Sequence, residues 1–372
     1  MAGRDVLLDQ RFMSLALTLG RRGLGNTWPN PAVGAVVVRR DGNEPVVVGR
    51  GWTQPGGRPH AETEALRRAG AAARGATLYA TLEPCSHHGK TPPCTDAIIA
   101  AGIARVVSAI EDPNALAGRG HALLRASGIV VDVGVGAAEA RRAHAGHIRS
   151  ICDNRPHVTL KLAVSADGKA GLVGRKPTAI TGEASGRRVH LIRAMNDAIL
   201  IGIGTALADD PQLTCRLPGM AARSPVRVVL DAALRLPVTS ALARGARVTP
   251  VWIMAGESAP TEAEAVLAAL GVKVFRLPAH GSKFDMMAVA RRLAELGITR
   301  LMVEGGPTVA AAFLAADLVD EAVLLRGPNP IGPDGIDALE TMPLSALTAS
   351  PLLRSRGIEP AGEDTIEIFE RT

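Results

Sequence analysis

Residues 83–94 read EPCSHHGKTPPC, and the segment HAE occupies residues 60–62 upstream of them. A hydrolytic zinc site takes three protein ligands and leaves the fourth position to water. One nitrogen and two sulfur ligands are present in these segments: His60, Cys85 and Cys94. Glu62 can face the open position, accept a proton from water and pass it to a leaving amine. The pattern predicts a site for one Zn²⁺ per chain, with Glu62 as its catalytic acid and base.

The spacing of the two cysteines differs from the shortest form of this motif. Zinc deaminases of nucleobases carry H-x-E followed by P-C-x-x-C, whereas SHHGKTPP lies between Cys85 and Cys94 here. An insertion between two metal ligands must pass close to the metal, so its polar side chains can reach a bound anionic substrate. These residues are His87, His88, Lys90 and Thr91. The alternative is a structural zinc site, in which His87 or His88 supplies a fourth ligand.

Hydrophobic periodicity around the motif predicts an α/β domain over residues 1–150. Short apolar strands bounded by turn residues alternate with helices that carry one apolar face. The helices are predicted at 10–20, 60–74, 94–103 and 120–128. The strands are predicted at 32–38, 45–52, 76–85, 104–113 and 129–135. A polar, helix-prone stretch at 137–156 indicates a linker helix, with the domain boundary near residue 150.

A second alternation of strands and helices fills residues 151–372. Its strands are continuous apolar runs, which is typical of a sheet buried on both faces. The strands are predicted at 157–165, 197–204, 226–231, 248–256, 272–278, 300–306 and 321–327. Helices are predicted at 186–195, 263–270 and 285–296. The chain is therefore expected to form two separate α/β domains.

Composition narrows the class of protein. The formal net charge of +6 is spread over scattered Lys and Arg residues, which suits anionic small molecules at least as well as nucleic acid. Aromatic residues make up 2% of the chain, too few to predict a stacking platform for single-stranded nucleic acid. No apolar stretch reaches the roughly 18–20 residues of a membrane helix. We expect a cytoplasmic homo-oligomer, dimer or tetramer, with a small-molecule substrate and neither a nucleic-acid nor a membrane partner.

The motifs HAE and EPCSHHGKTPPC, together with PNPAVGAVVV at 29–38, resemble the bifunctional deaminase/reductase family of riboflavin biosynthesis. DAILIGIGTALADDPQLTCR at 197–216 and VEGGPTVAAAFL at 303–314 extend this resemblance over essentially the whole chain. It implies a cytidine-deaminase-like three-layer α/β/α domain followed by a dihydrofolate-reductase-like α/β domain. It also implies zinc-dependent deamination of 2,5-diamino-6-ribosylamino-4(3H)-pyrimidinone 5′-phosphate. NADPH would then reduce the ribosyl group to ribityl, giving 5-amino-6-ribitylamino-uracil 5′-phosphate.

The resemblance also implies which residues hold each ligand. The deaminase substrate would contact Asn30, His87 and Lys90, of which Lys90 suits the phosphate. The substrate of the reductase would contact Lys161, Arg193, Asp209, Leu213, Arg216 and Glu304. NADPH would contact Ala163, Ala179, Thr205, Gly305, Gly306, Pro307 and Thr308.

The residues alone support the second site more weakly than the first. Gly305 and Gly306 precede a probable helix, where backbone N–H groups can approach a phosphate, although such a pair is more often a packing feature. Asp209 and Asp210 lie in what reads as a Gly-rich loop after a buried strand, where they equally suit a turn. Lys161 lies on a predicted strand and could simply point to solvent.

Two places depart from the family pattern. Thr53 stands where the family usually has a His shortly before HAE, and Pro177 and Ala179 replace the Ser and Trp of a Ser-x-Trp-Ile-Thr segment. The second departure removes a hydroxyl and a stacking surface near the nicotinamide. This departure leaves open a deaminase whose second domain does not reduce. Two further alternatives also stay open: a nucleic-acid deaminase and a nonenzymatic assembly protein stabilised by zinc.

Overall fold

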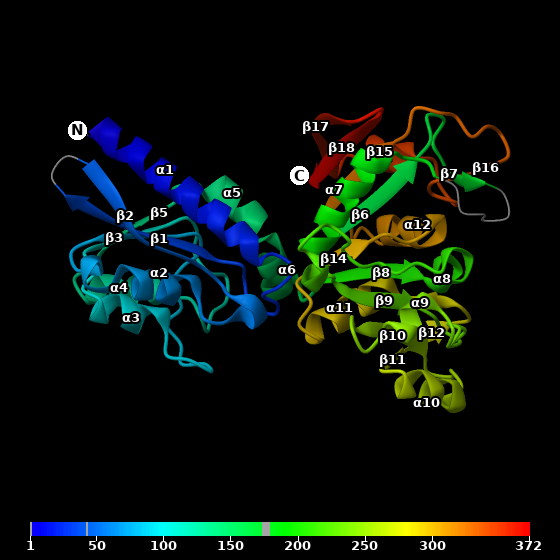
Figure 1. The fold of residues 1–372 in the computed structure, drawn as a ribbon, viewed down its shortest axis with the longest axis horizontal. Helices are drawn as coiled ribbons and strands as arrows, with labels where there is room; N and C mark the ends of the chain where they lie inside the picture. Colours follow the sequence, from blue (N-terminus) through cyan, green and yellow to red (C-terminus); the bar gives the residue numbers. More distant parts are fainter. Residues whose placement is uncertain (1, 42–43, 173–178) are drawn as a thin grey trace. The chain divides into compact units, whose positions relative to one another are not determined.

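The computed structural model describes residues 2–41, 44–172 and 179–372. The chain forms two compact units, Met1–Asn154 and Arg155–Thr372, each built around its own sheet (Figure 1). The stretch predicted as one linker helix contains two, α5 (Ala137–Ala143) and α6 (Ala145–Asp153), which are separated at His144. None of the helices in the described ranges is both long and apolar enough to cross a membrane.

The first unit contains a five-stranded sheet in the order β2-β1-β3-β4-β5. Its strands are β1 (Gly34–Asp41), β2 (Glu44–Trp52), β3 (Thr77–Ala80), β4 (Arg105–Ser108) and β5 (Val130–Val133). The β1 strand pairs antiparallel with β2 and β3, whereas β3, β4 and β5 run parallel. Every predicted strand of this half is present. The strands predicted at 76–85 and 104–113 end early, because their second halves leave the sheet as the loops that carry polar side chains.

Helices cover both faces of this sheet. They are α1 (Ala2–Gly20), α2 (Ala61–Ala69), α3 (Cys94–Ala100) and α4 (Gly120–Ala126), and Figure 1 shows α1 and α5 on the face opposite α2, α3 and α4. Close backbone approach fixes α2: a Cβ on Gly51 would lie 2.2 Å from the carbonyl oxygen of Ala61. The predicted cytidine-deaminase-like α/β/α fold is confirmed.

The second unit contains a nine-stranded sheet in the order β11-β10-β9-β8-β14-β6-β15-β18-β17. Seven of these strands are the predicted ones: β6 (His157–Val164), β8 (Ala198–Gly202), β9 (Val226–Leu230), β10 (Val251–Gly256), β11 (Lys273–Leu277), β14 (Arg300–Val303) and β15 (Glu321–Arg326). They run parallel, and an antiparallel hairpin of β17 (Leu353–Ala361) and β18 (Asp364–Arg371) completes one edge. The sequence did not indicate this hairpin, because most of β17 is exposed and carries no apolar run.

Shorter elements complete the second unit. Its helices are α7 (Glu183–Ala194), α8 (Ile203–Asp209), α9 (Ala241–Arg244), α10 (Thr261–Ala269), α11 (Met286–Glu295), α12 (Pro307–Ala315) and α13 (Ser345–Thr348). Two small sheets pair β7 (Lys169–Leu172) with β16 (Gly335–Asp337) and β12 (Ala279–His280) with β13 (Lys283–Phe284). The prediction of a Gly-rich loop bearing Asp209 and Asp210 was wrong for Asp209, which is the last residue of α8, whereas Asp210 is the C-cap of this helix. Gly202 is the N-cap of this helix, and good helix formers follow its glycines.

Candidate active sites

The predicted zinc ligands come from two helix starts and one loop on the same side of the first sheet. His60 is the N-cap of α2, and Cys94 is the first residue of α3. Cys85 lies in the loop that follows β3. Their ligand atoms all lie within 4.8 Å of one another, and no other His, Cys, Asp or Glu of the described residues belongs to such a group.

The distances within this group match a tetrahedral metal. The Nδ1 atom of His60 lies 3.6 Å from the Sγ of Cys85 and 3.3 Å from the Sγ of Cys94. Zn–S bonds of about 2.3 Å and Zn–N bonds of about 2.0–2.1 Å, at a tetrahedral angle, separate N and S by roughly 3.6 Å. His88, one candidate for a fourth ligand, faces Asp96 on α3 instead, with Nε2 3.7 Å from the carboxylate. The donor set therefore suits a zinc ion with an open fourth position.

Glu62 lies in the first turn of α2, and its side chain is buried. Burial raises the pKa of this carboxyl to about 7, although the neighbouring imidazole of His60 favours its ionised form. Hydrogen bonding with Cys94 lowers the pKa of the Cys85 thiol to about 4, so a thiolate is available to a cation. A carboxyl with a pKa near neutrality exchanges protons readily, which is what an acid–base catalyst requires.

Asn30 and Thr53 surround this group from the neighbouring loops. Asn30 Nδ2 donates to the carbonyl of Gly57 at 2.9 Å and lies 3.4 Å from His60 Nε2. Gly57 has a φ of +84°, and a Cβ there would lie 2.8 Å from the Asn30 side chain, so glycine is required at this position. Thr53, the residue in place of the family's His, is buried and accepts a hydrogen bond from the Val33 amide at 3.0 Å. The Thr53 hydroxyl therefore stabilises the fold through a hydrogen bond to the backbone.

Glu83 holds the loop that carries Cys85. Its buried carboxylate accepts hydrogen bonds from the amides of Asp112, at 3.1 Å, and His121, at 2.9 Å. A Cβ on Gly120 would lie 1.9 Å from the carbonyl oxygen of Pro84, so the two backbones are in direct contact. The sequence pattern did not single out Glu83, although its place two residues before the ligand cysteine was visible.

The insertion between the two cysteines forms an exposed loop. His87 and Lys90 both lie on it with exposed side chains. Arg58, which the sequence did not suggest, reaches this loop and donates from Nη1 to the Thr91 hydroxyl at 2.5 Å. The structure thus groups Asn30 with the ligand His60 and places His87 and Lys90 farther out, on the loop that joins the two cysteine ligands.

The second unit contains a cavity of about 640 Å³, a size typical of small-molecule sites. The strands β8, β14 and β6 are neighbours in the parallel sheet, and the residues at or just beyond their carboxyl ends line the cavity. Ligands of parallel α/β sheets usually bind at this edge. Every predicted residue of the reductase site except one lines this cavity. The lining residues are Lys161, Ala163, Ala179, Arg193, Thr205, Asp209, Leu213, Arg216, Glu304, Gly305, Gly306 and Pro307.

Thr308 is the exception. Its hydroxyl hydrogen-bonds to Glu340 outside the cavity lining, because the second residue of α12 turns away from the loop that precedes the helix. Ala179 lines the cavity, whereas Pro177 lies outside the described residues.

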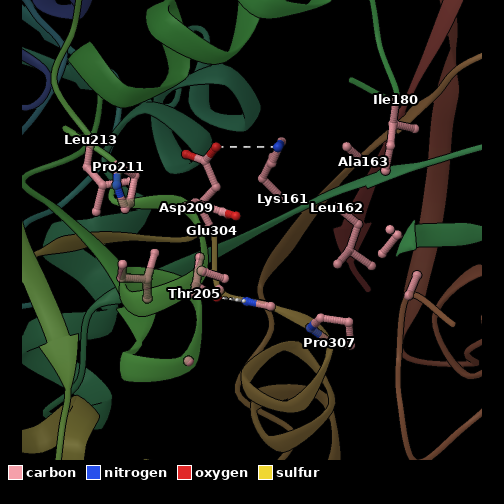
Figure 2. Close-up of a pocket in the computed structure, with 18 of the residues that line it drawn as sticks. Lys161, Leu162, Ala163, Ile180, Thr205, Asp209, Pro211, Leu213, Glu304 and Pro307 are labelled. Atoms are coloured by element: carbon pink, nitrogen blue, oxygen red, sulfur yellow. Dashed lines mark hydrogen bonds and ion pairs between the residues drawn. The ribbon is translucent and has the colours of Figure 1, made fainter. Parts of the chain in front are cut away.

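An ion-paired group of side chains forms one wall of the cavity. Glu304 Oε1 lies 3.3 Å from Lys161 Nζ and 2.9 Å from Arg193 Nη2, and Glu304 Oε2 accepts from Arg193 Nε at 3.0 Å. Figure 2 shows Lys161 and Glu304 facing each other across the dashed line. Burial alone would raise the pKa of Glu304, but the charges of Lys161 and Arg193 outweigh it and lower the pKa to about 2. This wall carries a net positive charge towards a ligand.

Thr205 and Asp209 line other parts of the cavity. Thr205 Oγ1 accepts a hydrogen bond from the amide of Gly306 at 3.1 Å, which ties α8 to the glycine loop before α12. Burial raises the pKa of Asp209. The sequence patterns did not indicate three further lining residues, because they come from the short strands β7 and β16, which are distant in sequence: Ala170, Gly171 and Ile336. Ile180 and Thr181, which follow Ala179, also line the cavity.

Comparison with known families agrees with both sites. Residues 7–110 match the cytidine and deoxycytidylate deaminase zinc-binding region, and residues 156–366 match the RibD C-terminal domain. The riboflavin biosynthesis protein RibD of Aquifex aeolicus is 39% identical over 98% of this chain and 99% of its own. RibD of Escherichia coli is also 39% identical, over 96% of this chain and 97% of its own.

Solved structures give the same result. Acinetobacter baumannii RibD has a TM-score of 0.86 at 33% identity, covering 99% of both chains. A Thermotoga maritima diaminohydroxyphosphoribosylaminopyrimidine deaminase/5-amino-6-(5-phosphoribosylamino)uracil reductase has a TM-score of 0.85 at 34% identity, covering 99% of this chain and 100% of its own. The chain therefore belongs to the RibD family of riboflavin biosynthesis enzymes, with a zinc-binding deaminase domain followed by a reductase domain.

Proposed function

We propose that the first unit deaminates 2,5-diamino-6-ribosylamino-4(3H)-pyrimidinone 5′-phosphate. The second unit then reduces the ribosyl group of the product with NADPH, which gives 5-amino-6-ribitylamino-uracil 5′-phosphate. The observation that carries the first step is the set of three ligands around a buried Glu62. The cavity beside the Lys161–Glu304–Arg193 group supports the second.

In the deamination, zinc held by His60, Cys85 and Cys94 would polarise the attacking water. The Glu62 carboxylate takes a proton from this water while the water oxygen bonds to the carbon that carries the amino group. It then returns the proton to the departing nitrogen, so the carbon–nitrogen bond breaks and ammonia leaves. Asn30 orients the substrate beside His60, and His87 and Lys90 reach its phosphate from the exposed loop.

In the reduction, NADPH would supply the hydride, and the protein residues position the sugar. Arg193 and Arg216 suit the 5′-phosphate of the substrate, because guanidinium groups bind phosphate oxygens in pairs. Asp209, whose pKa is raised by burial, orients the ribosyl hydroxyls. Lys161, Leu213 and Glu304 complete the substrate wall. The cofactor would lie against Ala163, Ala179, Thr205 and the loop Gly305–Thr308.

The proposed enzyme works in the cytoplasm as a homo-oligomer, with no nucleic-acid partner. Its two cysteine ligands require a reducing compartment, where thiols persist. Sedimentation of the purified protein would decide between dimer and tetramer. Robust, salt-dependent binding of RNA would count against a purely small-molecule partner.

A two-stage assay on the zinc-loaded protein tests both steps. Ammonia release is followed after addition of the diaminopyrimidinone phosphate, and NADPH oxidation is then followed by absorbance. Ammonia without oxidation would restrict the function to deamination and point to the altered Ala179 segment. Zinc-bound protein that releases no ammonia would contradict the proposed substrate.

The Glu62→Gln variant tests the role of the carboxylate. We expect it to retain zinc and to lose about 10²- to 10⁴-fold in deamination, because the amide cannot exchange the proton. NADPH oxidation with pre-deaminated substrate should be unchanged, which serves as an internal control. Normal deamination by this variant would show that Glu62 is not the proton carrier.

A further inference from the structure

We propose that Arg58 is an additional phosphate-binding residue of the deaminase site, and that it makes the enzyme prefer the phosphorylated substrate to its dephosphorylated form. The proposal rests on the deamination proposed above and adds a determinant of its specificity. Arg58 precedes the zinc ligand His60 by two residues.

The guanidinium of Arg58 lies against the loop that joins the two cysteine ligands. Its Nη1 donates to the Thr91 hydroxyl, and its Nη2 lies 3.5 Å from the point where a Cβ on Gly89 would sit. The Nε2 atom of His87 lies 3.5 Å from the same point. A cation and an imidazole therefore converge on the bare face of Gly89. Their nitrogens are close enough for one phosphate group to contact both.

This group of side chains has a surplus of positive charge. Within the described residues, Arg58, His87 and Lys90 have no carboxylate partner, and the nearby Asp96 faces His88. By contrast, Arg105 of this unit is ion-paired with Asp9 at 2.7 Å. Arg58 uses one donor on Thr91 and keeps the others available, and a guanidinium presents five N–H donors. An anionic group would neutralise this surplus.

The position of Arg58 also suits the length of the substrate. The pyrimidine must lie at the zinc ligands, with the ribose phosphate extending away from them. Two residues of backbone place the Cα atoms of Arg58 and His60 at most about 7 Å apart, and the arginine side chain extends beyond that. The loop that Arg58 contacts begins at Cys85 and ends at Cys94, so both ends of this loop lie at the proposed metal site.

The test compares deamination of the phosphorylated substrate with that of its dephosphorylated nucleoside, using the zinc-loaded full chain. We expect the wild type to prefer the phosphorylated substrate. Arg58→Ala should lower kcat/KM for this substrate by about 10- to 100-fold, mainly through KM, and change the nucleoside reaction by less than about twofold. Arg58→Lys should restore part of the preference. Thr91→Val, which removes the contact with the loop but keeps the charge, should retain most of it.

Arg141→Ala on α5 is the matched control, because Arg141 is exposed and lies away from this loop. It should leave both reactions unchanged. An equal loss of both reactions in Arg58→Ala, or a loss of zinc, would show that Arg58 only supports the fold and would overturn the proposal. An unchanged substrate preference would overturn it as well.

A binding measurement separates this proposal from the proposed reaction. Calorimetric titration with ribose 5-phosphate should show two sites in the wild type, one at Arg58 and one in the reductase cavity. Arg58→Ala should show only the site in the reductase cavity. Unaltered binding by Arg58→Ala would refute the role of Arg58, whatever the enzyme deaminates. If Arg58→Ala loses that site and the wild type deaminates neither compound, the phosphate-binding role of Arg58 is supported and only the proposed reaction is contradicted.

Discussion

The charge of Glu304 should stabilise the second unit by an amount that the structure allows us to estimate. The Glu304 side chain is 14% exposed and its carboxylate lies between Lys161 and Arg193, which lower its pKa from 4.5 to about 2. At 1.36 kcal/mol per pKa unit, this fall corresponds to about 3 kcal/mol in favour of the ionised form. Glu304→Gln resembles the protonated carboxyl in shape and removes this contribution. We expect the free energy of unfolding of the second unit to fall by about 3 kcal/mol at neutral pH.

The pH dependence follows from the direction of the change. A carboxylate whose pKa is lowered by folding stabilises the fold above its unfolded-state pKa, and the contribution is lost as the pH falls towards the folded-state value. The difference between wild type and Glu304→Gln should therefore be constant from about pH 8 to about pH 5 and should shrink between about pH 4.5 and pH 2.

The measurement is urea unfolding with linear extrapolation. Trp252 is the only tryptophan of the second unit, so its fluorescence reports this unit in a background where Trp28 and Trp52 are replaced by Phe. Glu359→Gln is the control, because Glu359 is 61% exposed in its ion pair with Arg188 and should change stability by less than about 0.5 kcal/mol. A Glu304→Gln difference that disappears between about pH 7 and pH 6 would refute the reasoning, because the carboxylate would then not be held ionised.

Three further variants probe the framework of the two sites. Cys94→Ser removes one of the three zinc ligands, and the described residues offer no substitute nearby. Metal analysis should therefore show much less than one zinc per chain, while NADPH oxidation persists. Full zinc content would contradict the ligand assignment. Gly51→Ala places a Cβ 2.2 Å from the Ala61 carbonyl, so thermal unfolding should show the first unit destabilised by about 1–3 kcal/mol. Gly186→Ala, which meets no atom within 4 Å, is its control, and equal melting of both variants would refute the close contact. Arg227→Met removes the buried guanidinium that binds the carbonyls of Gln212 and Thr249. Because Leu213 lines the cavity next to Gln212, the KM of the reduction should rise about tenfold with deamination unchanged, and an unaltered KM would show that the loop holds its shape without Arg227.

The sequence was most informative where one short segment carries several functional groups. The spacing of HAE and the two cysteines predicted the zinc-ligand group and the position of Glu62, because His60, Glu62 and Cys94 lie at helix starts and Cys85 follows a strand whose pattern is readable. The apolar runs likewise determined the seven parallel strands of the second unit. The exposed strand β17 was not predicted, because most of its side chains face solvent and leave no periodic hydrophobic signal.

The wider environment of the sites depended on contacts between distant segments. Arg58 reaches Thr91, Glu83 binds the amides of Asp112 and His121, and β7 and β16 contribute to one cavity, yet no local pattern relates these pairs. The charge state of Glu304 also depends on distant segments, since Lys161 and Arg193 come from β6 and α7. A sequence determines which chemical groups a chain carries and which local elements they lie on. Burial, and the approach of charges from separate elements, set pKa values and cavity walls, and only the tertiary structure decides them.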